Sequence, residues 1–343
     1  MESQQTTRRR ALARAAAFAA AAPAILPSRG AAQAGGRPLA LVSPGGFQVN
    51  FAEMMWMVAG GHLAREGFAP TLLGANGQAA ANAQLVAGHA SFTRSSMIDL
   101  VMAARDRPRP PMVGIATLYQ SSTFFVLSLP GAAVRGPSDF RGRKVGVVSV
   151  GGTTELLLDL MLARAGIPAA EVPRFVTGNN AGALQLVRQG RVDCFIASVN
   201  VVVALRRAGE DFVAMSTDEI APMPSQVYVA TPELVEREPD LVLRFLRALD
   251  ASARDFLGGR DVGAMVDAMA ARFEIPGLRD REALLATNRA AVELWLGQGR
   301  DNLLRNVPAL WRAGAEAIAR AGLARIARVE DFYRDDLLDR ARG

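Results

Sequence analysis

The stretch VVSVGGTTELLLDLMLARAG, Val147 to Gly166, carries the clearest fold signal in the sequence. An apolar segment passes through two glycines and two threonines into a helical pattern, which predicts a strand, a turn and a helix in succession. The helix start gathers free backbone N–H groups, which favour negative charge. The turn lacks the Gly-Lys-Ser/Thr of a phosphate loop and the spacing of a dinucleotide fingerprint. Two interpretations stay open: a small ligand at the helix start, or a helix capped by Thr153 or Thr154.

The same alternation of short strands and helices extends to both sides of this stretch. Before it, the sequence predicts strands at 37–46, 69–76 and 89–96, with helices at 51–67 and 78–88 between them. After Pro130 the order repeats, with strands at 143–152, 173–179 and 191–198 and helices at 153–165 and 181–190. Beyond Thr231 the pattern is almost wholly helical. Such alternation is typical of an α/β fold with mainly parallel sheets flanked by helices.

An internal repeat suggests that these elements form two similar lobes. AQLVAGHASFTRSS (83–96) and LQLVRQGRVDCFIASV (184–199) both read as a helix, a terminating glycine and a short apolar strand. Gly88 and Gly190 are the expected C-terminal cap glycines. We expect lobe 1 to comprise residues 35–128 and 225–343, including the late helices, and lobe 2 to comprise residues 129–224. The connections at 126–136 and 218–230 contain prolines, and we expect hinges near Ser128–Pro130 and Pro222–Gln226.

The first 34 residues have the layout of a cleavable export signal. A basic start precedes an apolar stretch at 15–26 and the small-residue ending AQA at 32–34. The apolar stretch is too short to span a bilayer of about 30 Å. TRRRAL at 7–12 resembles a twin-arginine signal, with Ala11 where an aromatic residue is usual. We expect export to the periplasm by this route, cleavage near Gly35 and no lipid anchor; a disordered Ala-rich tail is the alternative.

Composition narrows the function classes. The 343 residues carry a formal charge of +6, but removing residues 1–34 takes away five arginines and one glutamate and leaves +2, so nucleic acid is not a favoured partner. One cysteine, Cys194, excludes an intramolecular disulfide, and we expect it to be a buried strand residue. With His62 and His89 as the two histidines, both expected at the surface or at helix ends, we expect no metal site, no cofactor and no catalytic triad.

The chain resembles the periplasmic solute-binding proteins of ABC importers with the type 2 fold. The likeness is to the branch that binds nitrate, taurine, alkanesulfonates and thiamine-precursor pyrimidines, and it covers residues 38–343. The segments that carry it are GGHLAREGFAPTLL (60–73), AQLVAGHASF (83–92), FRGRKVGVVSVGGTTELLLDLMLARAG (140–166), VYVATPELVEREPDLVLRFLRALDAS (227–252) and RVEDFYRDDLL (328–338). One departure is Ser91, where the family usually has an acidic residue; Asp193 keeps it in the second lobe.

Candidate ligand contacts follow from the strand ends, because ligands of open α/β sheets bind outside the carboxyl ends of strands. In lobe 1 the candidates are Gly46, Phe47, Gln48, Asn50, Thr93, Arg94, Ser95, Tyr119 and Gln120. In lobe 2 they are Ser149, Gly151, Gly152, Thr153, Thr154, Asn179, Ser198 and Asn200, with Gln226 on the return crossing. Trp56 lies in an apolar helix and is expected in the core.

The ligand charge that we expect is inferred from Arg94. A guanidinium flanked by hydroxyl residues suits a carboxylate or sulfonate, and we expect it to face the Gly151–Thr154 helix start across the cleft. The alternative is an arginine that is solvated or paired with Asp99. The resemblance implies that a monomeric periplasmic protein passes a small organic anion or polar molecule to a membrane permease. An enzyme like those of thiamine-pyrimidine synthesis, or a periplasmic ligand sensor, are the alternatives.

Overall fold

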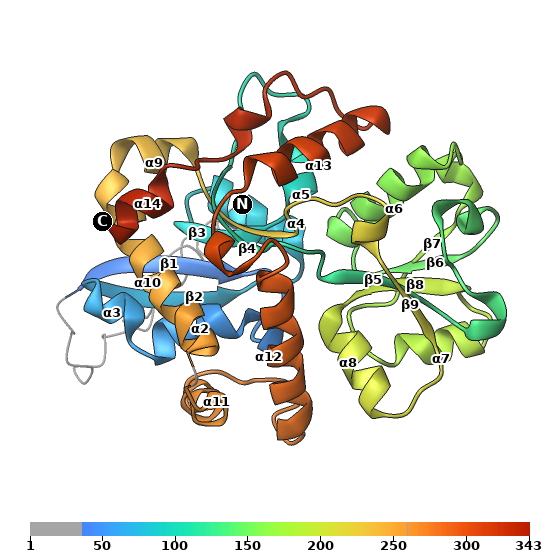
Figure 1. Cartoon of the computed structure of the whole chain (residues 1–343), viewed down its shortest axis with the longest axis horizontal. Helices are drawn as coiled ribbons and strands as arrows, with labels where there is room; N and C mark the ends of the chain where they lie inside the picture. The colour runs from blue at the N-terminus through green and yellow to red at the C-terminus, as the bar shows by residue number, and fades with distance from the viewer. Residues whose placement is uncertain (1–35, 259) are drawn as a thin grey trace, which may run out of the picture. The chain divides into compact units, whose positions relative to one another are not determined.

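Two five-stranded sheets form the framework of the computed structural model, which describes residues 36–258 and 260–343. The predicted export signal at 1–34 lies outside the described residues. The first sheet has the order β2-β1-β3-β10-β4, built from β1 (Arg37–Ser43), β2 (Phe68–Gly74), β3 (Phe92–Ser95), β4 (Val113–Tyr119) and β10 (Gln226–Ala230). The second has the order β7-β6-β8-β5-β9, built from β5 (Phe124–Ser128), β6 (Val145–Val147), β7 (Arg174–Val176), β8 (Cys194–Ser198) and β9 (Val213–Ser216). Figure 1 shows β1 to β4 on the left and β5 to β9 on the right.

Both sheets are mainly parallel, and each contains one antiparallel strand. β10 pairs antiparallel with β3 and β4, and β5 pairs antiparallel with β8 and β9. The remaining pairs, β1 with β2 and β3, and β6 with β7 and β8, are parallel. The two sheets therefore share one topology with the odd strand in the fourth position. This matches the predicted pair of similar lobes and the fold class.

The chain passes between the sheets at two places. The first crossing lies between the end of β4 at Tyr119 and the start of β5 at Phe124. The predicted lobe boundary at residue 128 falls later, at the end of β5, because the apolar run before Pro130 reads equally well as the last strand of lobe 1. The second crossing leads from η5 (Thr217–Glu219) to β10 and contains Pro222, where a hinge was predicted. Below, lobe 1 means the first sheet with its helices, and lobe 2 the second.

Helices cover both sheets. Those of lobe 1 are α2 (Ala52–Ala59), α3 (His62–Arg65), α4 (Gln78–Val86), α5 (Met97–Ala104), α9 (Pro232–Arg237), α10 (Pro239–Leu257), α11 (Val262–Ala270), α12 (Arg281–Trp295), α13 (Pro308–Arg320) and α14 (Leu337–Arg342). Those of lobe 2 are α6 (Thr153–Arg164), α7 (Ala183–Arg188) and α8 (Val199–Arg207). The other short 3-10 turns are η1 (Val49–Phe51), η2 (Pro130–Ala132), η3 (Pro137–Phe140), η4 (Ala169–Glu171), η6 (Arg300–Asn302) and η7 (Val329–Phe332). In the described part of the chain, no helix is long and apolar enough to cross a membrane.

Glycines set several helix ends. Gly88 and Gly190 follow α4 and α7 with φ of 78° and 67°, which confirms both predicted cap positions. The sequence predicted one continuous helix over 51–67, but the structure has two helices there, α2 and α3, so this prediction was wrong. α2 ends at Ala59 with Gly60 as its C-cap, and Gly61 has a φ of 73°, a left-handed conformation that an α-helix does not continue.

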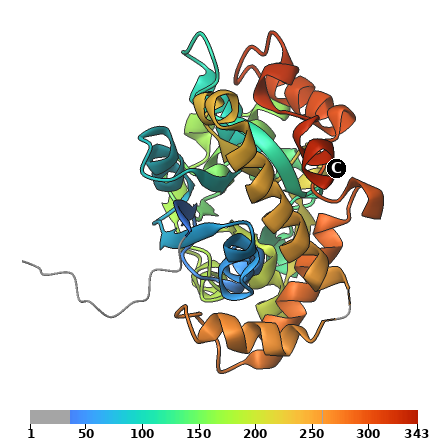
Figure 2. The ribbon, with the colours of Figure 1, turned by 90° about the vertical axis from the view of Figure 1, so that its left-hand side faces the viewer.

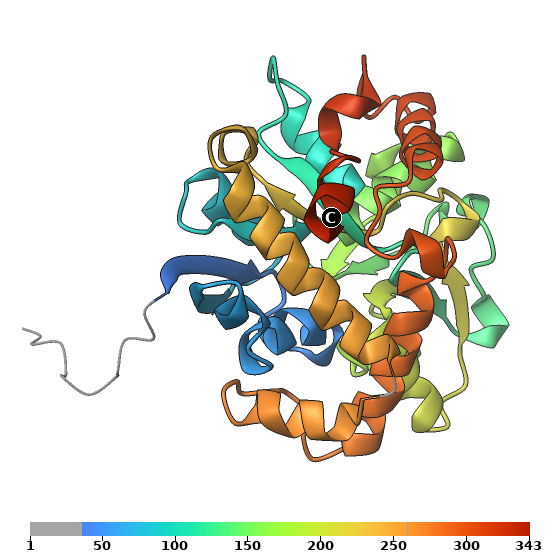
Figure 3. The ribbon, with the colours of Figure 1, turned by 60° about the vertical axis from the view of Figure 1, so that its left-hand side comes forward.

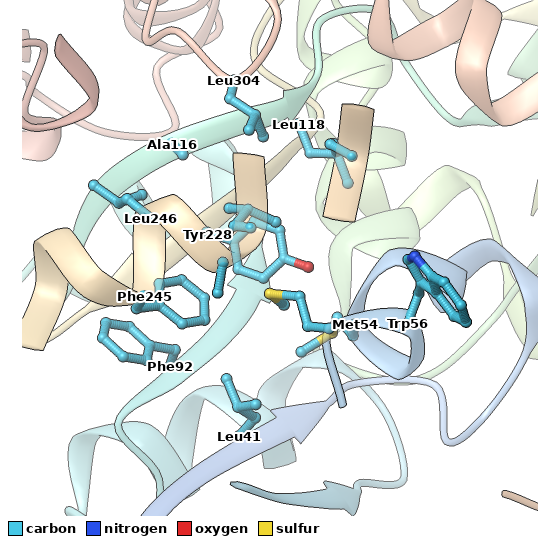
Figure 4. Packing of buried hydrophobic residues seen from close by; sticks show 14 of the residues in the cluster. Leu41, Met54, Trp56, Phe92, Ala116, Leu118, Tyr228, Phe245, Leu246 and Leu304 are labelled. Carbon is cyan, nitrogen blue, oxygen red and sulfur yellow. The ribbon is translucent and has the colours of Figure 1, made fainter. Parts of the chain in front are cut away.

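The C-terminal helices complete the core of lobe 1. The ring of Phe245 on α10 stacks on Phe92 of β3 with centroids 3.8 Å apart and lies 5.7 Å from the ring of Tyr228 on β10. Figure 4 shows these rings beside Leu41 and Met54. The helix α10 packs against α2, α3 and α14, and its diagonal course is seen in Figure 3. The residues after β10 are helical, as predicted, and they form part of lobe 1.

Helices also join the two lobes. α12 packs against α8, and α5 and α13 pack against α6. Arg207 on α8 reaches Asp280 and Glu282 near the start of α12, with N–O distances of 3.3 and 3.1 Å. Figure 2 shows the late helices, coloured gold to red, beside the blue strands of lobe 1. The lobes are therefore held together by packing as well as by the two chain crossings.

Candidate functional site

A cavity of about 600 Å³ lies between the two sheets and is lined by both lobes. It collects the segments that follow the carboxyl ends of β1, β2, β6, β7 and β8, which is where an open α/β sheet binds its ligands. Its volume is in the range of sites for small organic molecules. The lining combines amides and hydroxyls with apolar side chains, including Phe51 from lobe 1 and Phe124 from lobe 2.

Ten of the predicted contact residues line this cavity. From lobe 1 and the return crossing they are Gly46, Gln48, Asn50, Arg94 and Gln226, and from lobe 2 they are Ser149, Thr153, Thr154, Asn179 and Ser198. The rule that ligands bind beyond strand ends therefore located one continuous site from residues far apart in the sequence. That these residues bind a ligand stays a prediction.

The other eight predicted residues are not in the cavity wall. They are Phe47, Thr93, Ser95, Tyr119, Gln120, Gly151, Gly152 and Asn200. Most have other partners. Phe47 packs on Phe273 with ring centroids 5.0 Å apart, and the Thr93 hydroxyl donates to the carbonyl of Val42. In β3, Thr93 and Ser95 alternate with Arg94, so they point to the opposite face of the sheet.

Hydrogen bonds within lobe 1 hold two more of these residues. The Tyr119 hydroxyl donates to the carbonyl of Asn50 at 3.3 Å. The Gln120 amide nitrogen donates to the carbonyls of Thr117, Asn302 and Arg305 at 2.9 to 3.1 Å. Tyr119 therefore supports a residue of the cavity wall, whereas Gln120 bonds to residues outside the wall.

Arg94 has a partner that neither sequence interpretation foresaw. Its side chain is 1% exposed, and its Nη1 donates to Glu53 Oε1 at 2.5 Å and to the carbonyl of Asn50 at 3.0 Å. The guanidinium also lies over the rings of Phe51 and Tyr119, at 4.2 and 5.2 Å from their centroids. Burial is the largest influence and lowers the pKa of Arg94, but Glu53, Tyr119 and Tyr228 together outweigh it, so the pKa is raised. The alternative of an arginine paired with Asp99 is therefore wrong.

The N-terminus of α6 shows whether Thr153 or Thr154 caps this helix. Gly152 is the N-cap residue, and no side chain caps the helix. The Thr154 hydroxyl instead accepts a hydrogen bond from the backbone N–H of Val148, the residue after β6. The Thr153 hydroxyl donates to Asp99 Oδ2 at 2.6 Å. The alternative of a threonine-capped helix is therefore wrong, because each hydroxyl is bonded outside the helix.

The contact of Thr153 with Asp99 connects α6 of lobe 2 to α5 of lobe 1. Ser96 donates a second hydrogen bond to the same carboxylate oxygen at 2.6 Å, and its own hydroxyl accepts the backbone N–H of Asp99 at 3.3 Å. Burial raises the pKa of Asp99 to about 6, although the hydrogen bonds from Ser96 and Thr153 oppose the rise. A hydrogen bond to a titrating group thus crosses between the lobes beside the cavity.

Sequence reasoning missed the segment that follows β2. Gly74, Ala75, Asn76, Gly77 and Gln78 all line the cavity. The Gln78 amide nitrogen donates to the carbonyl of Arg94, which connects the start of α4 to β3. The strand at 69–76 was predicted, so the strand-end rule would have found this segment had it been applied there. Thr123 and Phe124 were missed because the first crossing was expected later.

The remaining reactive groups lie apart from the cavity wall. Cys194 is buried in β8, as predicted, and burial raises the pKa of its thiol to about 12. His62 begins α3, so it is at a helix end as expected, but it is buried rather than at the surface, and its Nε2 lies 2.9 Å from Asp255 Oδ2. Trp56 is in the core, as expected, and its Nε1 donates to the same carboxylate. Across residues 36–258 and 260–343, no group of His, Cys, Asp and Glu side chains is arranged to hold a metal ion.

Comparison with solved structures finds this fold in binding proteins. The ligand-binding component of an ABC-type import system from Staphylococcus aureus is 16% identical, with a TM-score of 0.64 over 89% of this chain and 99% of that one. The nitrate-binding protein NrtA from Synechocystis PCC 6803 is 14% identical, with a TM-score of 0.63 over 89% and 88%. The alkanesulfonate-binding protein SsuA from Xanthomonas axonopodis pv. citri is 12% identical, with a TM-score of 0.61 over 89% and 97%. These likenesses establish the periplasmic-binding-protein type 2 fold.

The same fold also carries an enzyme. The desulfurization enzyme DszB is 14% identical, with a TM-score of 0.55 over 89% of this chain and 99% of that one. A comparison with curated protein sequences finds no match. The family model described as NMT1/THI5 like matches residues 48–258, which include most of the cavity wall and every strand except β1. The chain belongs to the NMT1/THI5-like family.

Proposed function

We propose that this protein is the substrate-binding component of an ABC importer. It captures a small organic anion or polar molecule between its two lobes and delivers it to a membrane permease. The observation that carries the proposal is the cavity of about 600 Å³, which takes its wall from both lobes at the carboxyl ends of their strands. The fold shared with import-system, nitrate-binding and alkanesulfonate-binding proteins supports the same role.

Binding rather than catalysis fits the chemistry of the cavity wall. Its polar side chains are amides and hydroxyls with one arginine, and the single cysteine lies in β8 away from it. Hydroxyls of Thr153 and Ser198 are bonded to Asp99 and to Asn179 and Asn200, with no histidine beside them to act as a base. We therefore place this chain with the binding proteins rather than with the enzyme DszB.

We also propose a periplasmic, monomeric protein that uses no cofactor and binds no nucleic acid. Its export by the twin-arginine route rests on TRRRAL at 7–12. N-terminal sequencing of protein recovered from the periplasm should find a start at or near Gly35. A functional protein that starts at Met1 would contradict the export proposal, and unchanged export after Arg8 and Arg9 are replaced by lysine would contradict the route.

Native mass spectrometry of the purified protein tests the binding role. We expect a fraction of molecules to carry one small organic molecule, which denaturation releases for identification. Asn179→Ala should lose at least tenfold in affinity for that molecule, because Asn179 lines the cavity. Asn180→Ala is the matched control, since this neighbouring amide donates to the carbonyl of Thr177 and is not in the wall. Turnover of the carried molecule by the protein alone would contradict the binding role and favour an enzyme.

A further inference from the structure

Resting on the proposed function, we propose that the cavity selects an uncharged organic ligand, and that Glu53 sets this selectivity by neutralising Arg94. Among the described residues that line the cavity, Arg94 is the one with a charged side chain. Without Glu53 its guanidinium would attract a carboxylate, a sulfonate or an inorganic anion. With Glu53 in place, the pair contributes no net charge to the cavity floor.

The geometry of this pair places the two opposite charges in direct contact through Arg94 Nη1 and Glu53 Oε1, while Arg94 Nε and Glu53 Oε2 are buried with no hydrogen-bond partner among the described residues. Glu53 on α2 and Arg94 on β3 are 0% and 1% exposed, and their closest nitrogen and oxygen lie 2.5 Å apart. The Tyr228 hydroxyl donates to the same Glu53 oxygen at 2.8 Å. A ligand anion would have to separate this pair or stay without a countercharge in a poorly solvated place. Removing one partner of a buried ion pair is strongly unfavourable because it leaves a buried charge uncompensated.

Acidic groups also occupy the other place that would attract an anion, the start of α6. The backbone N–H of Gly151 donates to Glu155 Oε2 at 2.6 Å, and the Thr153 hydroxyl donates to Asp99. Arg174 balances Glu155 in part, from 3.4 Å. An anion at this helix start would compete with two carboxylates for the same donors. The Glu155 and Asp99 carboxylates therefore offset part of the positive end of the helix dipole.

The rest of the wall suits a neutral molecule with polar and apolar parts. Amides of Gln48, Asn50, Asn76 and Gln226 line it, and an amide both donates and accepts hydrogen bonds. A carboxylate or sulfonate offers only acceptors, whereas a carboxamide, sulfonamide or neutral heterocycle offers both. Phe51 and Phe124 provide apolar surface for a carbon framework. The wall has no acidic side chain for a cationic ligand either.

Matched pairs of probes test the inference on the wild-type protein. Benzamide against benzoate, and benzenesulfonamide against benzenesulfonate, differ in charge at almost constant shape. Calorimetric titration at constant ionic strength should find that the amide or sulfonamide binds at least tenfold more tightly than its anionic partner. Equal or tighter binding of benzoate or benzenesulfonate would overturn the inference and leave the proposed function standing.

Glu53→Gln tests the role assigned to Glu53. The variant leaves the Arg94 charge unpaired, so the ratio of anion to amide affinity should rise at least tenfold. Glu66→Gln is the control, because Glu66 pairs with Arg247 at 3.0 Å outside the cavity, and its ratio should match the wild type. An unchanged ratio in a folded Glu53→Gln protein would overturn the assignment, and the wild-type comparison decides the ligand charge if the variant does not fold.

The molecule identified by native mass spectrometry gives an independent answer. A carried molecule with no ionised group at pH 7 would support the inference, and one with a carboxylate, sulfonate or phosphate would overturn it. The absence of any carried molecule, together with no binding by all four probes, would count against the proposed function itself. The two failures are therefore distinguishable.

Discussion

The hydrogen bond between Thr153 and Asp99 should contribute to stability in a way that depends on pH. Thr153→Val keeps the shape of the side chain and removes the hydroxyl that donates to the buried carboxylate at 2.6 Å. Since the pKa of Asp99 is raised to about 6, the acceptor is charged at pH 7.5 and largely protonated at pH 5. A hydrogen bond to a charged group contributes about 1.5–3 kcal/mol, and one between neutral groups about 0.5–1.5 kcal/mol.

We therefore expect Thr153→Val to lower the free energy of unfolding by about 1.5–3 kcal/mol at pH 7.5 and by about 0.5–1.5 kcal/mol at pH 5. Urea unfolding followed by circular dichroism at both pH values measures the difference. Thr93→Val is the matched control, because the buried Thr93 hydroxyl donates to the neutral carbonyl of Val42 at 2.7 Å. Its cost should be the same at both pH values. Equal costs of Thr153→Val at pH 5 and pH 7.5 would refute the reasoning.

The wild type should become less stable as pH rises from about 4 to about 6, because the pKa of Asp99 is about 6 in the folded state and near the ordinary 3.8 in the unfolded state, so the folded state holds more protons in this range. Free energies of unfolding measured over this pH range should show the decline for the wild type and not for Asp99→Asn. Arg94→Met should cost about 3–5 kcal/mol by leaving Glu53 buried and unpaired, whereas Arg207→Ala in the exposed pair with Glu282 should cost no more than about 1 kcal/mol in the same assay. Cys194 should resist a thiol reagent until denaturant is added, and rapid labelling of the native protein would contradict its burial.

The order of elements and the place of the cavity could be predicted because both depend on local patterns. Apolar strands, glycine caps and helical periodicity depend on residues that are close together in the sequence. The rule that ligands bind beyond the carboxyl ends of strands then predicts that Ser149, Asn179 and Ser198 lie together. The first crossing was placed too late because Phe124–Ser128 has no local feature that shows which sheet it joins. That choice depends on its pairing with β8 and β9.

The partner of Arg94 could not be predicted for a related reason. Glu53 and Arg94 are 41 positions apart, and Glu53 reads in the sequence as a polar residue within an apolar helix. Asp99 was the nearer candidate, but it lies in the first turn of α5, where Ser96 and Thr153 bond to it instead. Side-chain pairing across elements depends on the packing angle of α2 on the sheet, which periodicity does not give.

The position of β10 has a consequence for how the nascent chain folds. β10 fills the gap between β3 and β4, yet it follows the entire second sheet in sequence. The strands of lobe 2 form one uninterrupted segment from Phe124 to Ser216, so that lobe can complete its sheet as soon as it leaves the ribosome. Lobe 1 meanwhile holds β3 and β4 with open edges, which are sites for pairing with other chains. The facing edges of β3 and β4 can therefore be closed only once Gln226–Ala230 has been synthesised.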